Sequence, residues 1–161
     1  MRRMNDFDFL HGSWDVANRR LAALLTPGSE VWEEFPGRSV VRPLFEGGGN
    51  IDEITFPTLG GRRGVTLRLF DREAGKWSIY WSSSRTGRLD PPVSGGFAGE
   101  RGDFYGDDSY EGLPVRVHFT WHRLGPDAAR WEQEFSADGG VTWELNWVMD
   151  FTRTGPATVG L

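Results

Sequence analysis

The chain has 161 residues, of which 38% are apolar and 25% charged, and its formal net charge is −5 at pH 7. The negative charge argues against nucleic acid as a partner, since phosphate binding needs a basic face, and the sequence contains no run of roughly 18 apolar residues that could span a membrane. Because there is no cysteine, disulfides, thiolate metal sites and thiol nucleophiles are excluded, and we expect a single cytoplasmic domain over residues 1–161.

The predicted elements begin with a short helical turn within the first ten residues, which contain Phe7, Phe9 and Leu10. Strand-like segments follow, each bounded by glycine, proline or aspartate turn signals. They cover residues 13–21, 30–35, 38–46, 50–56, 65–71, 76–84, 115–124, 129–136 and 141–153, with two short glycine-broken pieces around 97 and 103–106. This pattern of roughly eight to eleven short strands with hairpin-length turns is typical of an antiparallel barrel or sandwich.

Alternation within the strands predicts which side chains face inward. We take the apolar phase of each strand as the inner one. It comprises residues 65, 67 and 69; 77, 79, 81 and 83; 115, 117, 119 and 121; 129, 131, 133 and 135; and the odd positions from 143 to 151. Two sheets packed about 10 Å apart leave little room for tryptophans that face each other, so the pattern favours an all-β, closed antiparallel up-and-down barrel.

Five polar residues also fall on the inner phase of their strands. They are Asn18, Arg20, Asp52, Ser83 and Gln133. A buried polar group costs about 1–3 kcal/mol unless it is paired, so these residues form either a satisfied internal network, in which Asp52 and Arg20 pair, or the polar grip on a ligand. In the second case Asp52 is a candidate general base and Arg20 a candidate for stabilising charge.

A family resemblance rests on "HGSWDV", in which Gly12-Ser13-Trp14 opens the first strand. It resembles the Gly-x-Trp signature of the calycin superfamily, which comprises lipocalins, fatty-acid-binding proteins and related barrels. In lipocalins a basic residue from the last strand packs across this tryptophan. The resemblance therefore implies that Arg153 lies over Trp14 and closes the barrel, a contact of about 0.5–2 kcal/mol.

The longer pattern of "FDFLHGSWDV", "YWSSS", "GFAGERGDFYGDD" and "RWEQEFSADGGVTWELNWVMDFTR" is similar to an uncharacterised family of bacterial calycin-like domains. This likeness implies a fold and little about activity. The chain departs from the longer Gly-x-Trp-x-Gly-x-Gly motif of the haem-binding nitrobindins, so no haem is expected.

Other chemistry finds no support in the sequence. His118 and His122 lie about 13 Å apart along one strand and on its outer phase, which is too far for two ligands of one metal. The acidic stretch from Asp107 to Glu111 lacks the spacing of a calcium loop, and its aspartates are better interpreted as turn residues. Phosphate-loop, serine-hydrolase and metalloprotease motifs are absent from the sequence. We therefore expect neither a cofactor nor a metal.

Three functions stay open. The first is binding of a small hydrophobic or aromatic molecule inside the barrel, at a site composed of Asn18, Arg20, Asp52, Trp81, Ser83, Trp121, Trp131, Gln133 and Trp147. The second is a cyclase, isomerase or lyase acting in the same pocket through Asp52 or Arg20. The third is an interaction module that forms a homodimer through its outer face, with Tyr80, His118 and His122.

The tryptophans themselves leave one alternative open. Those expected to face inward could form an aromatic cage, or they could fill the barrel and leave no cavity. They are Trp77, Trp81, Trp121, Trp131, Trp143 and Trp147.

Overall fold

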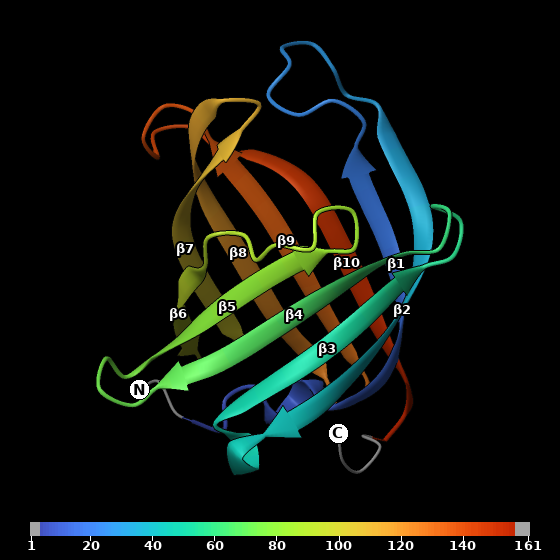
Figure 1. Ribbon diagram of the computed structural model, residues 1–161, viewed down its shortest axis with the longest axis vertical. Helices are drawn as coiled ribbons and strands as arrows, with labels where there is room; N and C mark the ends of the chain where they lie inside the picture. Colours follow the sequence, from blue (N-terminus) through green and yellow to red (C-terminus); the bar gives the residue numbers. More distant parts are fainter. Residues whose placement is uncertain (1–3, 157–161) are drawn as a thin grey trace.

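The computed structural model describes residues 4–156 and shows an all-β, closed antiparallel barrel (Figure 1). Each strand pairs with its neighbour in the sequence, and β1 pairs with β10 to close the sheet. The strands are β1 (Gly12–Leu21), β2 (Trp32–Leu44), β3 (Gly49–Phe56), β4 (Arg62–Asp71), β5 (Lys76–Ser83), β6 (Val93–Ala98), β7 (Arg101–Tyr110), β8 (Leu113–Gly125), β9 (Ala128–Ser136) and β10 (Glu144–Gly155). The predicted fold class is confirmed.

Two short 3-10 helices lie at the lower end of the barrel in Figure 1. The first, η1 (Asp8–Leu10), is the helical turn that the sequence predicts, and the second, η2 (Phe45–Gly47), connects β2 to β3. No helix within residues 4–156 is long and apolar enough to cross a membrane.

The N-terminal segment plugs this lower end. Phe7 and Leu10 are fully buried, and the Phe7 ring packs edge-on against Trp77 and Phe97, with ring centroids 5.0 Å away in both cases. The indole N–H of Trp14 donates to the Leu10 carbonyl at 2.9 Å. Large aromatic side chains thus fill this half of the barrel.

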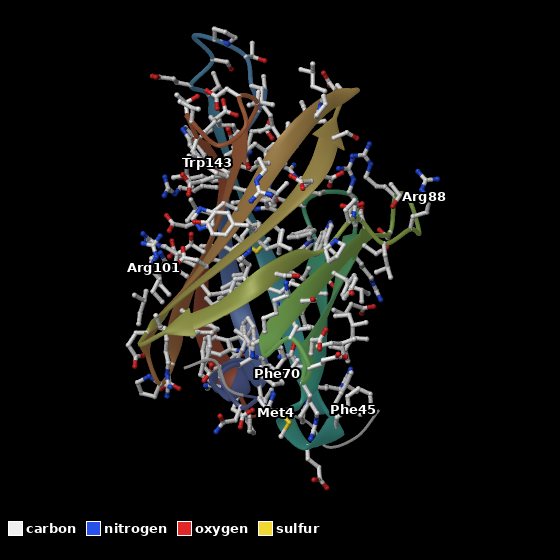
Figure 2. All side chains as sticks on the ribbon, turned by 90° about the vertical axis from the view of Figure 1, so that its left-hand side faces the viewer. Met4, Phe45, Phe70, Arg88, Arg101 and Trp143 are labelled. Carbon is white, nitrogen blue, oxygen red and sulfur yellow. The ribbon has the colours of Figure 1, made fainter. Side chains whose placement is uncertain are left out.

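The opposite end carries the long β1–β2 loop, the β9–β10 turn and the tight turn after β7 (Figure 1). Figure 2 shows Met4, Phe45 and Phe70 toward the plugged end, and Arg88 and Trp143 toward the other end, which we call the mouth. The two ends therefore differ in construction, one packed by an internal segment and the other framed by loops.

The predicted inner phase is correct in β5, β8 and β9, where Trp77, Val117 and Trp131 are buried, but it is wrong in β4. There Thr66 and Arg68 face inward, and the predicted inner residues 65, 67 and 69 lie half-buried on the outer face. The reason is the pairing with β3, because Asp52 lies opposite Thr66 and Asn50 lies opposite Arg68. Directly opposite residues of two strands share a face, so the polar side chains of β3 and β4 lie next to one another inside the barrel and can form hydrogen bonds.

The phase of β10 is correct from Trp147 to Phe151 but wrong for Trp143 and Leu145. A bulge between Leu145 and Trp147 shifts the register against β9, and the extra residue, Asn146, is fully buried. Because the side-chain period of a strand is two, one inserted residue exchanges the faces. Trp143 consequently packs outside the barrel against His118, with ring centroids 5.7 Å apart.

Two turn predictions are also wrong. Pro36 and Gly37 do not end a strand but lie within β2, since the ladder with β3 begins only at Arg38 and the missing N–H of proline has no partner to lose there. Asp107 and Asp108 lie in β7, and the turn follows at Glu111 and Gly112, whose φ angles are 49° and 82°.

Candidate functional site

A cavity of about 550 Å³ occupies the upper half of the barrel and reaches the mouth. Its walls are mixed, with apolar and aromatic side chains interrupted by polar and charged ones. The lining includes residues at the mouth ends of several strands, among them Leu21, Arg62 and Tyr110. The aromatic plug does not extend into this half. The tryptophans and phenylalanines therefore fill only the lower half of the barrel, and the upper half holds a cavity.

Four tryptophans contribute to the walls, namely Trp81, Trp121, Trp131 and Trp147. The Trp147 ring lies 5.6 Å from that of Trp131 and 6.3 Å from that of Trp81, both in edge-on geometry. Its indole N–H donates to the Asn18 amide oxygen at 3.0 Å, which fixes the ring orientation. These rings present a rigid apolar surface suited to a flat or elongated molecule.

The floor of the cavity carries a buried ion pair. Arg68 Nη1 lies 2.6 Å from the Asp52 carboxylate and donates to the Asn50 amide oxygen at 2.8 Å. The guanidinium also lies over the rings of Phe7 and Trp121, at 5.5 and 5.4 Å from their centroids. Arg68 thus separates the aromatic plug below from the cavity above.

The protonation chemistry of Asp52 reflects two opposed influences. Burial raises the pKa of the Asp52 carboxyl, whereas the charge and hydrogen bond of Arg68, with a hydrogen bond from Thr66, oppose the rise. A carboxylate held by a guanidinium at this distance is a poor proton acceptor unless a ligand disturbs the pair.

Two buried donors at the cavity have no partner among the described residues. They are Nε of Arg68 and Nδ2 of Asn146, and both residues line the cavity. The oxygen of the Asn146 side chain is already used, because Gln133 Nε2 donates to it at 2.9 Å. A buried donor without a partner is costly, so the cavity offers hydrogen bonds that the chain itself does not accept.

The predicted pocket residues divide into those that line the cavity and those that do not. The lining includes Arg20, Asp52, Trp81, Trp121, Trp131, Gln133 and Trp147. Asn18 lies behind Trp147 and supports it. Ser83 is not part of the lining, and its hydroxyl accepts from the backbone N–H of Arg85 at 3.2 Å.

The predicted pairing of Asp52 with Arg20 is wrong, because Arg68 occupies that place. Arg20 instead points to the mouth, with its guanidinium between the rings of Phe35 and Trp147 at 4.9 and 5.0 Å. Apolar alternation in the sequence does not reveal Arg68 or Asn146, because the inward orientation of each follows from strand pairing or a bulge. The signal for Arg68 was its spacing from Thr66, which matches the spacing of Asn50 and Asp52 on β3.

Two of the six tryptophans considered for an aromatic cage lie elsewhere. Trp77 is fully buried among the packed rings below the cavity, and Trp143 lies outside the barrel toward the mouth end (Figure 2).

At the plugged end Arg153 lies over Trp14, with the guanidinium carbon 4.2 Å from the ring centroid. It also donates to the carbonyl oxygens of Phe9, His11 and Pro126, at 2.7, 2.5 and 3.1 Å. The contact expected from the family resemblance is present, and it extends to the plug.

The outer histidines are both held within the chain. His118 lies between Asp103 and Glu134, at 2.8 and 3.0 Å, beneath a stacked Tyr105 ring, and His122 pairs with Glu132 at 2.6 Å. Within residues 4–156, no group of three or more histidine or acidic side chains is placed to hold a metal ion. The homodimer hypothesis for this face stays a prediction.

Comparison with known proteins bears on the fold. No protein-family model matches the chain, and no curated protein sequence matches it. Among solved structures, the chain is similar to the S-type phycobiliprotein lyase CPES from Guillardia theta, with a TM-score of 0.57 and 12% sequence identity over 96% of this chain and 93% of that chain. At this identity the likeness shows a shared barrel fold.

Proposed function

We propose that this protein binds a small hydrophobic or aromatic molecule inside its barrel. The observation that carries the proposal is the contrast between the two halves, since one is packed solid with aromatic rings and the other holds a cavity of about 550 Å³ open at the mouth. A packed interior of the same length would give a more stable barrel, so the empty upper half is the feature that needs a function.

The cavity has the character of a ligand site. Its volume lies within the roughly 300–1,000 Å³ typical of small-molecule pockets, which are mostly apolar with a few placed polar groups. Four indoles form the walls, and the polar groups are confined to the floor around Arg68, the Gln133–Asn146 pair and the mouth.

The fold comparison agrees with a ligand function. The neighbour is named as a phycobiliprotein lyase, so a barrel of this shape is used by a protein with a named lyase function. We further propose membership of the calycin superfamily, and the contact of Arg153 with Trp14 supports it.

Titration with the neutral fluorophore N-phenyl-1-naphthylamine tests binding. We expect saturable probe emission, with quenching of the wall tryptophans, because a flat apolar ring system matches the cavity. Val117 lines the cavity, so Val117→Phe should weaken probe binding about tenfold by filling space.

The matched control is Val65→Phe, which makes the same change on the outer face of β4 and should leave the dissociation constant unchanged. Absence of any saturable probe signal, or equal effects of the two substitutions, would count against the proposal.

A second candidate is catalysis on the bound molecule, as a cyclase, isomerase or lyase. The specific observation in favour is that Asp52, a carboxyl whose pKa burial raises, lies on the cavity floor with a cationic partner beside it. Ligand binding ranks first because the 2.6 Å pair with Arg68 occupies the carboxylate.

The catalytic candidate predicts a chemical change in the bound molecule. A compound recovered with the protein and identified by native mass spectrometry would be returned to wild-type and Asp52→Asn protein. Wild type should convert it and the variant should not, although both still bind. Recovery of the compound unchanged from both proteins leaves binding as the only function of the pocket.

A further inference from the structure

The mouth of the cavity contains an arginine with no carboxylate partner. Arg20 is half-buried, lines the cavity and is held between the Phe35 and Trp147 rings. Within residues 4–156, no acidic oxygen lies within 4.0 Å of its guanidinium nitrogens. The rings hold the planar group in place, and its N–H groups remain available at the edge of the apolar cavity.

Two further arginines flank this position. Arg62 and Arg85 also line the cavity, and in the same described range neither forms an ion pair within 4.0 Å. The Ser84 N–H donates to the Arg63 carbonyl, and the Arg63 N–H donates to the Ser84 hydroxyl, so Arg62 and Arg85 come from adjoining positions of neighbouring chain segments. Like charges placed in this way are destabilising.

The electrostatic effect of this grouping reaches Arg20. Burial lowers the pKa of the Arg20 guanidinium, the charges of Arg62 and Arg85 lower it further, and Glu33, which is opposite Arg20 on β2, counteracts them. Glu33 influences the pKa of Arg20 more than either Arg62 or Arg85 alone, so it offsets part of the repulsion that Arg20 experiences.

Acidic side chains also line the cavity near the mouth, and one of them, Glu33, lies opposite Arg20 on the neighbouring strand. Asp90, Asp107 and Asp108 also line the cavity, and Asp107 is paired with Arg116 on β8 at 3.1 Å. Burial raises the pKa of Asp90, and the charge of Asp108 adds to the rise, which indicates that these two carboxyls lie near one another. Among the described residues, no ion pair joins these aspartates to Arg20, Arg62 or Arg85. The three arginines are thus accompanied by one carboxylate, that of Glu33, and keep an excess of positive charge.

Hydrogen-bonding capacity inside the cavity points in the same direction. Four buried side-chain donors lack a partner among the described residues, and two of them belong to Arg68 and Asn146, which line the cavity. The Asp52 carboxylate, by contrast, is already engaged by Arg68. A ligand that supplies acceptor oxygens would satisfy what the chain leaves open.

We propose that the ligand is an amphiphile whose apolar body lies among the indoles and whose oxyanion, a carboxylate, sulfonate or phosphate, binds Arg20 with help from Arg62 and Arg85. This proposal rests on the proposed function, since it names the chemical class of the molecule in the same pocket. A guanidinium offers paired N–H groups that match such an anion, and the anion relieves the repulsion among the arginines.

Two fluorophores that share a skeleton test the charge alone. One is the neutral N-phenyl-1-naphthylamine, and the other is 8-anilino-1-naphthalenesulfonate, which adds a sulfonate to the same ring system. The measured quantity is the ratio of the neutral to the anionic dissociation constant. We expect a ratio above about ten at low salt, falling as salt screens the mouth charges.

The arginine variants then locate the effect. Arg20→Gln should lower the ratio about tenfold, and Arg20→Lys should retain part of it because the charge remains. Arg62→Gln and Arg85→Gln should each lower it about twofold, as exposed charges do. The control Arg38→Gln removes one arginine from the outer face of β2 and should leave the ratio unchanged.

The outcomes separate the two proposals. If neither fluorophore binds, the proposed function fails. If the neutral probe binds but the sulfonate adds no affinity, or Arg20→Gln and Arg38→Gln act alike, only the anion site is refuted. Should Arg20→Gln disturb the fold by circular dichroism, the double variant Arg62→Gln/Arg85→Gln decides, since both residues are exposed; its ratio should fall about fourfold, and an unchanged ratio refutes the site.

Discussion

At the scale of single residues, Arg153 connects parts of the chain that are far apart in sequence. It belongs to the last strand, stacks on Trp14 of the first, and donates to Phe9 and His11 of the plug. The carbonyl groups at the end of a 3-10 turn have no hydrogen-bond donor within the turn, and the Arg153 guanidinium provides the missing donors. One side chain therefore joins barrel closure to the seating of the plug.

Removal of this side chain should be costly. We expect Arg153→Met to lower the free energy of unfolding by about 2–4 kcal/mol, since it loses both the ring contact and charged hydrogen bonds at a partly buried site. Urea denaturation followed by tryptophan fluorescence measures the change.

The control for Arg153 is Arg19→Met. Arg19 also lies over a tryptophan, Trp32, at 5.6 Å, but on the exposed face of β1. Its loss should cost less than about 0.5 kcal/mol. Comparable losses in the two variants would show that Arg153 acts as an ordinary surface cation.

The pair of Asp52 and Arg68 illustrates a different residue-scale principle. Each group alone would be a strongly unfavourable buried charge, and the two are placed opposite a polar neighbour on the adjoining strand. Their joint burial supplies a polar floor in an otherwise apolar barrel.

At the scale of elements, a single inserted residue determines which side of β10 faces the cavity. The bulge at Asn146 turns Trp143 outward and brings Trp147 and Met149 inward. Gly64 on β4 is required for a related reason, because a Cβ there would lie 1.9 Å from the Trp81 ring. The wall thus depends on backbone detail as much as on the indoles themselves.

The turn between β9 and β10 is organised by one carboxylate. Asp138 accepts from the backbone N–H groups of Val141 and Thr142, at 3.0 and 2.9 Å, and from the hydroxyls of Ser136 and Thr142. These hydrogen bonds, chiefly those from Thr142, hold the pKa of Asp138 well below its usual range. The turn therefore prefers the ionised form.

This preference gives the turn a predictable dependence on pH. A carboxyl whose folded-state pKa is lowered contributes stability above its unfolded pKa, and the contribution is lost as the pH falls through the folded value. The melting temperature of wild type should exceed that of Asp138→Asn at neutral pH, and the gap should narrow below about pH 4. Thermal melts across this range provide the measurement, and a gap that stays constant would contradict the assignment.

At the scale of the whole molecule, the two halves of the barrel interior differ, because one is filled with side chains and the other encloses a cavity. A closed sheet of this size encloses more volume than its own side chains need fill. The N-terminal segment and a cluster of rings fill the lower half, while the upper half retains the cavity. The packed rings are concentrated in one half, and the other half keeps the space in which we propose that a ligand binds.

Much of this architecture follows from the sequence. Strict alternation in β5, β8 and β9 determined the strand type and the inner face, and glycine and aspartate turns determined the hairpin connections, because both are local properties of a pleated backbone. The four tryptophans of the cavity wall could be predicted in the same way, since each stands on the apolar phase of its strand, and in β10 the bulge turns outward only residues before Trp147.

The remainder was decided by the tertiary structure. Arg68 faces inward beside its polar cross-strand partner on β3, and Trp143 faces outward because a bulge interrupts the alternation. Arg20 lies at the mouth because it stands near the end of β1, opposite Glu33 on β2 and Trp147 on β10. Each of these depends on which residue stands opposite in a neighbouring strand. Pairing partners lie far away along the chain, so alternation within one strand carries no information about them.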